Sequence, residues 1–274
     1  MPAIRFRLRV LAMGLAALWL AGCGALSVSE EQELGDEAAR ELRTHLDFVA
    51  DPWVRDYVEA IGARVAGAAG PQPYTYRFHV VQDDDLNAFA LPAGHIYINT
   101  GVVLASSDVS ELAGVIAHEV GHVALRHVAH NYRRERNTGV FYQIGALALG
   151  LLVGGDVAAG GQMIGEVAAV AFMNTFTRAA EEEADRFAVE VLPRAGYHPA
   201  GLVSFFETLA SQGDGHLPEF LSSHPATESR IEATAARVAA ADLPPDLAVR
   251  DDGRLQIIQR RIQLLGSGRG RGPL

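Results

Sequence analysis

Two histidines and a glutamate are spaced for metal chemistry. His118, Glu119 and His122 form an H-E-x-x-H pentad. On a helix, histidines four positions apart project from one face, so both imidazoles can bind one metal ion, and Glu119 can reach a water molecule there without being a ligand. Chance alone gives the pattern with a probability on the order of a few per cent. The pentad therefore indicates hydrolysis assisted by a metal ion, provided that it lies on a helix.

A catalytic zinc site needs a third protein ligand and an open position for water. Candidates for the third ligand lie further along the chain, in the helical stretch that contains Glu181, Glu182, Glu183 and Asp185. Glu181 and Asp185 share one helix face, so one could bind the metal while the other holds a ligand imidazole in the correct tautomer. A solvated acidic patch fits the spacing equally well.

The elements that must position these side chains follow from periodicity. Asp108, followed three residues later by Glu111, is typical of a helix start of the capping-box kind, and apolar residues continue at helical spacing into the pentad. Helices are also expected over 29–48 and 51–69, and strands over 74–81 and 93–99. Two helices, a small sheet and then mostly helices favour an α+β domain over alternating βαβ units.

The first residues have the layout of an export signal. Three arginines, an apolar run over 10–20 and two small residues precede Cys23. The run is shorter than the roughly 20 residues of a membrane-spanning helix, although a spanning anchor remains the alternative. Residues 20–23, Leu-Ala-Gly-Cys, resemble the bacterial lipoprotein box, so we expect removal of 1–22 and a lipid anchor on Cys23. Gly24 in place of aspartate favours, by resemblance, the outer membrane facing the periplasm.

Composition narrows the function classes. The 33 acidic residues exceed the 23 basic ones, which are all arginine, so the net charge of -10 gives no general attraction to nucleic acid. Without the three leader arginines the charge becomes 20 − 33 = −13. A single cysteine excludes an internal disulfide framework and a cysteine-rich zinc module.

The expected organisation is a lipidated linker at 23–29, one domain at 30–250 and a C-terminal extension at 251–274. The glycine- and arginine-rich end, from Gly266, is expected to be a disordered tail. The apolar but glycine-broken segment 140–172 fits a packed helical pair best, with a lid or a membrane-dipping element as alternatives.

Several segments in succession resemble the HtpX-like and CAAX-endopeptidase-like zinc metallopeptidases, and among them the periplasmic lipoprotein members of the LoiP and BepA type. These segments are N-A-F-A-L-P at 87–92, G-H-I-Y-I-N-T-G at 94–101, the pentad, Arg126-His127, Arg178, and the E-x-x-x-D pattern of Glu181 and Asp185. The likeness extends from about Glu30 to about Ala240, with the motifs in the family's order.

The resemblance implies a mainly helical, zincin-like domain with a small β-sheet and the metal-binding motif on a central helix. It implies one Zn²⁺ per chain, held by His118, His122 and Glu181, with Glu119 as the general base. Asp185 matches the acid that supports a ligand histidine.

Four further residues are interpreted beside the same resemblance. His224, in a histidine-proline pair, matches a histidine that can approach the zinc, where it would stabilise the oxyanion or occupy the site of the water. Glu182 and Glu183 look like helix-surface residues. His127 is expected to point away from His118 and His122 and to make a structural hydrogen bond.

The strand before the pentad has a functional interpretation in such peptidases, as an edge strand that pairs with extended substrate. The residues concerned are Gly94, His95, Ile96, Tyr97, Ile98 and Asn99. A plain interior strand is the alternative.

The function expected is a metalloendopeptidase that acts on polypeptides, which the resemblance suggests are misfolded or unassembled cell-envelope proteins. The rival is a chaperone-like lipoprotein that works with the outer-membrane assembly machinery, with weak or gated proteolysis. The pentad alone also permits a zinc hydrolase that acts on another bond.

Overall fold

The structure, a computed structural model, describes residues 26–131, 176–211, 220, 223–225, 227–249, 251 and 253–269. The leader with Cys23 and the apolar segment 140–172 lie outside these residues. Among the helices that are described, none combines the length and the apolar character needed to cross a membrane.

The described sheet has three strands in the order β1-β3-β2. Strand β1 (Arg77–Val81) runs parallel to β3 (His95–Asn99), and β2 (Ala88–Ala90) pairs antiparallel with β3 on its other side. The sequence did not predict β2. The strand expected over 93–99 begins only at His95, because Pro92–Gly94 form the 3₁₀ turn η1, in which Ala93 and Gly94 have φ angles of 59° and 92°.

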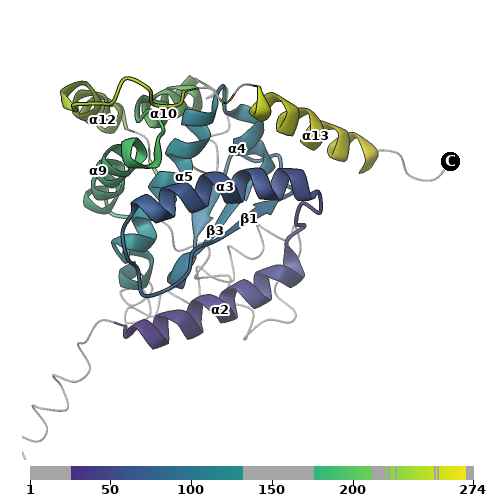
Figure 1. Ribbon diagram of the computed structural model, residues 1–274. Coiled ribbons are helices and arrows are strands. Elements are labelled where there is room, and N and C mark those ends of the chain that lie inside the picture. Colours follow the sequence, from purple (N-terminus) through teal and green to yellow (C-terminus); the bar gives the residue numbers. More distant parts are fainter. Residues whose placement is uncertain are drawn as a thin grey trace, which may run out of the picture.

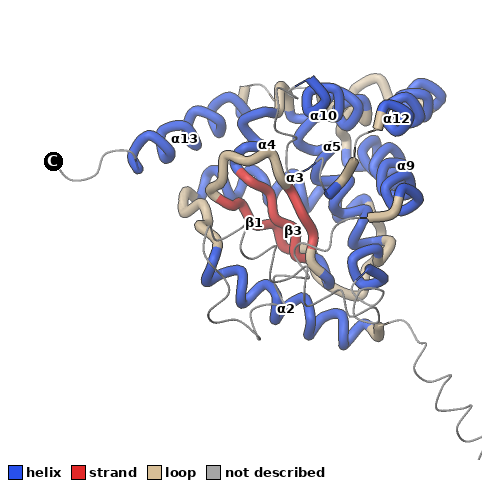
Figure 2. Tube along the Cα trace, turned by 180° about the vertical axis from the view of Figure 1, so that it is seen from behind, coloured by secondary structure: helices blue, strands red, loops and turns tan. Residues whose placement is uncertain are grey.

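Helices cover the sheet on both faces (Figures 1 and 2). Helix α2 (Val28–His45) packs on one face, where its apolar residues join Phe89 and Tyr97 in a small core cluster. Ile96 and Ile98 point to the opposite face and belong to the main core, which includes residues of α3 (Pro52–Ala68) and α5 (Val109–Ala124). The alternation of β3 thus divides the hydrophobic interior into two layers.

Helix α5 is the central element of the larger layer. It contacts α3, α9 (Arg178–Ala195) and α10 (Ala200–Ser211), and every residue from Val109 to Val123 is buried. Its start is as predicted: the Asp108 carboxylate accepts hydrogen bonds from the backbone N–H groups of Ser110 and Glu111. A mainly helical domain with a small sheet and the pentad on a central helix is therefore confirmed.

Three helices complete the described fold: α4 (Thr100–Ala105), α12 (Glu228–Ala240) and α13 (Arg254–Arg269). Helix α13 packs against α3 and α4 and extends away from the body (Figure 1). The prediction that a tail begins at Gly266 is wrong, because α13 continues to Arg269. Glycine and serine are unfavourable in a helix interior, but here they lie in the last turns. There they extend a helix that is already nucleated, so the cost of nucleation does not fall on them.

Candidate metal centre

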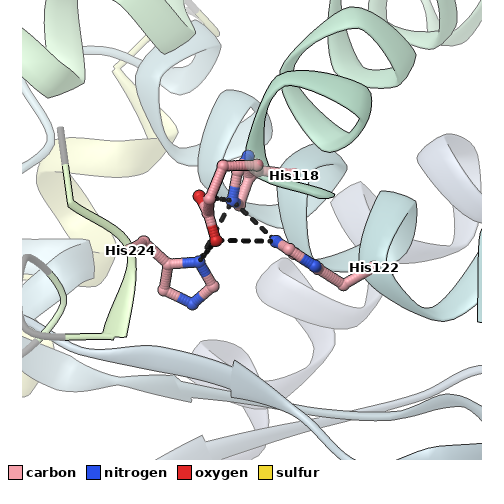
Figure 3. A group of neighbouring side chains, drawn as sticks. His118, His122 and His224 are labelled. Atoms are coloured by element: carbon pink, nitrogen blue, oxygen red, sulfur yellow. Dashed lines mark hydrogen bonds and ion pairs between the residues drawn. The ribbon is translucent and has the colours of Figure 1, made fainter. Parts of the chain in front are cut away.

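Four side chains from three parts of the chain converge at one buried point. His118 and His122 lie on α5, Glu181 lies in the first turn of α9, and His224 lies between α10 and α12. One nitrogen or oxygen atom from each lies within 4.8 Å of those of the others, and all four residues are almost completely buried. The three imidazoles point toward a common centre (Figure 3).

The distances fit a bound metal ion. His118 Nε2 lies 3.0 Å from His122 Nε2 and 3.4 Å from Glu181 Oε2, and His122 Nε2 lies 3.5 Å from Glu181 Oε1. Ligand atoms held tetrahedrally about 2.0–2.1 Å from zinc stand about 3.3 Å apart. Imidazole and carboxylate are also ligands that zinc accepts. Lone pairs gathered at a buried point need a positive charge between them, so the residues present fit zinc.

A close approach of two helices brings Glu181 to the histidines. A Cβ added to Gly121, inside the pentad, would lie 3.0 Å from a ring carbon of Phe187 and 3.3 Å from the Cα of Ala184, both on α9. Only a residue without a side chain lets α9 lie this near to α5. The close packing of α9 on α5 therefore explains why the residue just before His122 is glycine.

Asp185 lies against the first histidine. Its Oδ1 lies 3.0 Å from Nδ1 of His118, the nitrogen turned away from the metal centre. Burial alone would raise the pKa of Asp185, but hydrogen bonds from His118 and Arg230 outweigh burial and lower it. Burial would likewise lower the pKa of His118, yet Asp185 and Glu181 raise it to about 9 in the absence of metal.

Arg230, on α12, was given no role from the sequence, although it neutralises both buried carboxylates. Its Nε and Nη2 each donate to Asp185 at 2.8 Å, and its Nη1 lies 2.8 Å from Glu181 Oε2. Nη1 also donates to the carbonyl of Pro225 at 2.9 Å, which ties down the loop that carries His224. The side chain is only 2% exposed. A sequence offers no local signal for a partner 45 positions away.

His127 and Glu183 also belong to the surroundings of the site, contrary to expectation. His127 Nδ1 lies 3.1 Å from His122 Nδ1, and His127 Nε2 lies 3.1 Å from Glu183 Oε2. The prediction that His127 makes a structural hydrogen bond is confirmed, but the prediction that it points away from His122 is wrong. The prediction assumed a continuous helix, whereas α5 ends at Ala124.

Two aromatic rings flank the histidines. Phe176 stacks on His122 with ring centroids 3.8 Å apart, and Phe220 stacks on His224 at 4.6 Å. They restrict the ring orientations and exclude water from that side. Single phenylalanines in the sequence gave no signal for this role.

Glu119 lies beside the centre without joining the four donors. It is fully buried, and neither of its carboxylate oxygens has a hydrogen-bond partner among the described residues. His224 Nε2 lies 3.5 Å from its Oε1. Burial raises the pKa of Glu119. A buried, unpartnered carboxylate is costly, which is typical of a group kept for chemistry.

The proposed substrate strand must be corrected. All five residues of β3 pair with β1, and its other side pairs with β2 and with flanking residues, through Leu91 N–H to His95 O and Asn99 N–H to Asn87 O. Gly94 belongs to η1 and not to the strand. Because both hydrogen-bonding sides of β3 are used within the sheet, residues 94–99 cannot pair with a substrate, and the interior-strand alternative holds.

This helix-borne H-E-x-x-H motif, completed by a carboxylate from a following helix, is the site of a metallopeptidase. Residues 52–238 match Peptidase family M48, and the chain belongs to that family. The matched segment contains all four donors of the metal centre as well as Glu119.

Named relatives agree with this assignment. The chain is 32% identical over 210 residues to the β-barrel assembly-enhancing protease of Escherichia coli K12, covering 75% of this chain and 43% of that protein. It is 29% identical over 220 residues to the metalloprotease LoiP of the same organism, covering 79% and 83%. With the mitochondrial metalloendopeptidase OMA1 of Arabidopsis thaliana it shares 30% identity over 180 residues, covering 66% and 35%. The chain thus spans less than half of the first of these relatives.

Proposed function

We propose that the protein is a zinc-dependent metalloendopeptidase that binds one Zn²⁺ per chain. His118, His122 and Glu181 hold the metal, and Glu119 is the general base. The observation that carries the proposal is the convergence of three buried donors from two helices beside a buried carboxylate that has no hydrogen-bond partner.

Zinc held by such residues supplies Lewis acidity, which lowers the pKa of a water molecule to about 7 and polarises a carbonyl. A carboxylate oxygen of Glu119 takes the proton of the attacking water as that water adds to the scissile carbonyl. Glu119 then returns the proton to the departing amine nitrogen. Asp185 holds the proton on His118 Nδ1, which leaves Nε2 free as a ligand atom.

Metal removal tests this proposal. We expect the purified chain to cleave casein, to stop when 1,10-phenanthroline removes the zinc, and to recover when Zn²⁺ is added back. Mg²⁺ serves as the control ion and should not restore cleavage, because it prefers octahedral oxygen ligands. Cleavage by protein that elemental analysis shows to be free of metal would contradict the assignment.

We extend the proposal to substrate and location. The substrates are extended segments of misfolded or unassembled cell-envelope proteins, and the protein is anchored by lipid on Cys23 in the outer membrane, facing the periplasm. The names of the relatives, one of which enhances β-barrel assembly, support the substrate class. The arginine-rich start, the apolar run and the Leu-Ala-Gly-Cys box support the anchor.

His224 favours a second candidate function, in which the protein assists outer-membrane assembly and its proteolysis is gated. His224 Nδ1 lies 2.9 Å from Glu181 Oε1 and 3.3 Å from His118 Nε2, so it stands among the donors. A zinc site with four protein ligands is closed, as in structural sites, whereas a catalytic site keeps one position open. As a fourth ligand, His224 would occupy the place that a reacting water needs.

Replacing His224 tests whether this side chain blocks the water position and so limits proteolysis. We expect His224→Ala to retain one zinc per chain, because three ligands remain, and to cleave casein about tenfold faster if the open arrangement is populated about a tenth of the time. Casein cleavage and bound zinc are measured together, with His45→Ala as the control, since His45 is exposed at the end of α2. Slower cleavage with zinc retained would contradict a gate and favour stabilisation of the oxyanion.

A further inference from the structure

The connection between α5 and the residues after it turns His127 back toward the metal centre. In a continuous helix, position 127 would lie well round the helix from His122. Instead α5 ends at Ala124, and Arg126 has a φ of 58°, in the left-handed region that arginine rarely adopts. The reversal places His127 Nδ1 3.1 Å from His122 Nδ1.

This turn is held from outside by helix α2. Arg126 Nε donates to Glu31 Oε2 at 2.9 Å, and Arg126 Nη2 lies 2.7 Å from the same oxygen. Glu31 lies on α2, and its side chain is only 2% exposed. A charge-assisted pair of this kind around a buried carboxylate fixes the arginine, and with it the backbone before His127. Helix α2 precedes the segment that matches the family, yet it braces the end of the metal-binding helix.

The hydrogen bonds around His127 define one consistent set of protons. His122 Nε2 faces the other metal-ligand atoms, so it must be unprotonated to bind metal. The proton of the neutral imidazole therefore lies on Nδ1. His127 Nδ1 must then accept that proton's hydrogen bond. The remaining proton of a neutral His127 lies on Nε2, which donates to Glu183 Oε2 at 3.1 Å. Each nitrogen has a partner of the right kind.

The ends of this chain of hydrogen bonds differ in exposure. The side chain of His127 is 7% exposed and that of Glu183 is 49% exposed, while His122 is fully buried. A carboxylate at the surface is therefore connected, through one imidazole, to a ligand of the buried centre. Glu183 was expected to be an ordinary surface residue, and its contact with His127 gives it a different role.

We propose that His127 is a positioning residue for the metal centre: it accepts a hydrogen bond from His122 Nδ1, fixes the ligand nitrogen that faces the metal, and is itself oriented by Glu183 and by the Arg126–Glu31 turn. The inference rests on the metal-binding part of the proposed function and not on peptide hydrolysis. Its test therefore uses zinc binding, so that a chain that binds zinc without cleaving casein leaves it standing.

Zinc affinity of the whole chain is measured by competition with a chromophoric chelator. We expect His127→Ala to weaken binding about 10- to 100-fold, the usual cost of losing such a support. His127→Asn should recover most of this loss, because the asparagine Oδ1 can accept the same hydrogen bond. Glu183→Ala should weaken binding in the same direction. Glu190→Ala, an exposed glutamate on the same helix, is the control and should bind as wild type does.

The visible spectrum of the Co²⁺-substituted chain separates positioning from general stability. We expect the bands to shift or broaden in His127→Ala and to return toward wild type in His127→Asn, because the spectrum reports the geometry of the ligands. If His127→Ala folds poorly, Glu183→Ala still tests the proposal, because Glu183 is half exposed and its replacement should not impair folding. Wild-type affinity and spectrum in Glu183→Ala and His127→Ala would overturn the proposal. So would a His127→Asn variant as weak as His127→Ala.

Discussion

Glu119→Gln is expected to abolish nearly all casein cleavage while leaving the bound zinc unchanged. Glutamine has the size of glutamate but cannot take a proton from the attacking water, and a general base typically contributes about 10²–10⁴-fold to the rate. Glu119 is not among the four donors, so the metal should remain. Both carboxylate oxygens lack hydrogen-bond partners in the described residues, so the amide breaks no existing bond.

Glu111→Gln is the matched control, because Glu111 is also buried on α5. Its carboxylate accepts from Ser107 N–H and from the Ser204 hydroxyl, away from the metal centre. Cleavage by this variant should stay near the wild-type rate. If Glu119→Gln cleaves as fast as wild type, the assignment of the base is wrong. If wild type binds zinc but does not cleave, the gate at His224 becomes the explanation, and if no zinc binds, the ligands are misassigned.

Local patterns predicted the elements that carry the site. The capping residue Asp108 and the helical spacing after it placed the pentad on α5, and the two helices before the sheet were also found. The choice of Glu181 over its acidic neighbours needed the family resemblance. In the structure Glu181 is 1% exposed, whereas Glu182 is exposed at the surface of the same helix, a difference that spacing alone does not reveal.

The errors share a physical origin in contacts between distant segments. Whether β3 is an edge or a central strand depends on β1 and β2 pairing on its two sides, and β2 has only three residues, too few to show a period. His127 depends on a left-handed arginine that α2 holds in place. In both cases tertiary structure overrides the local pattern.

Arg230→Met is expected to destabilise the zinc-free protein by about 3–5 kcal/mol, the usual effect of breaking a buried ion pair. Methionine can fill much of the space, but it leaves the carboxylates of Asp185 and Glu181 without the guanidinium that lies 2.8 Å from each. Urea unfolding, monitored by circular dichroism, gives the free energy of unfolding. The zinc-free form is used because a bound cation would neutralise part of the same charge.

Arg237→Met is the control on the same helix, since Arg237 lies in the last turn of α12 and is partly exposed. It should change the free energy of unfolding by no more than about 0.5 kcal/mol. Adding Asp185→Asn to Arg230→Met removes one of the two carboxylates that have lost the guanidinium, so the double variant should regain at least about 1 kcal/mol relative to additive losses. Strictly additive losses would mean that Arg230 acts through its packing on Phe206, 5.0 Å from the guanidinium carbon, and not through the buried charges.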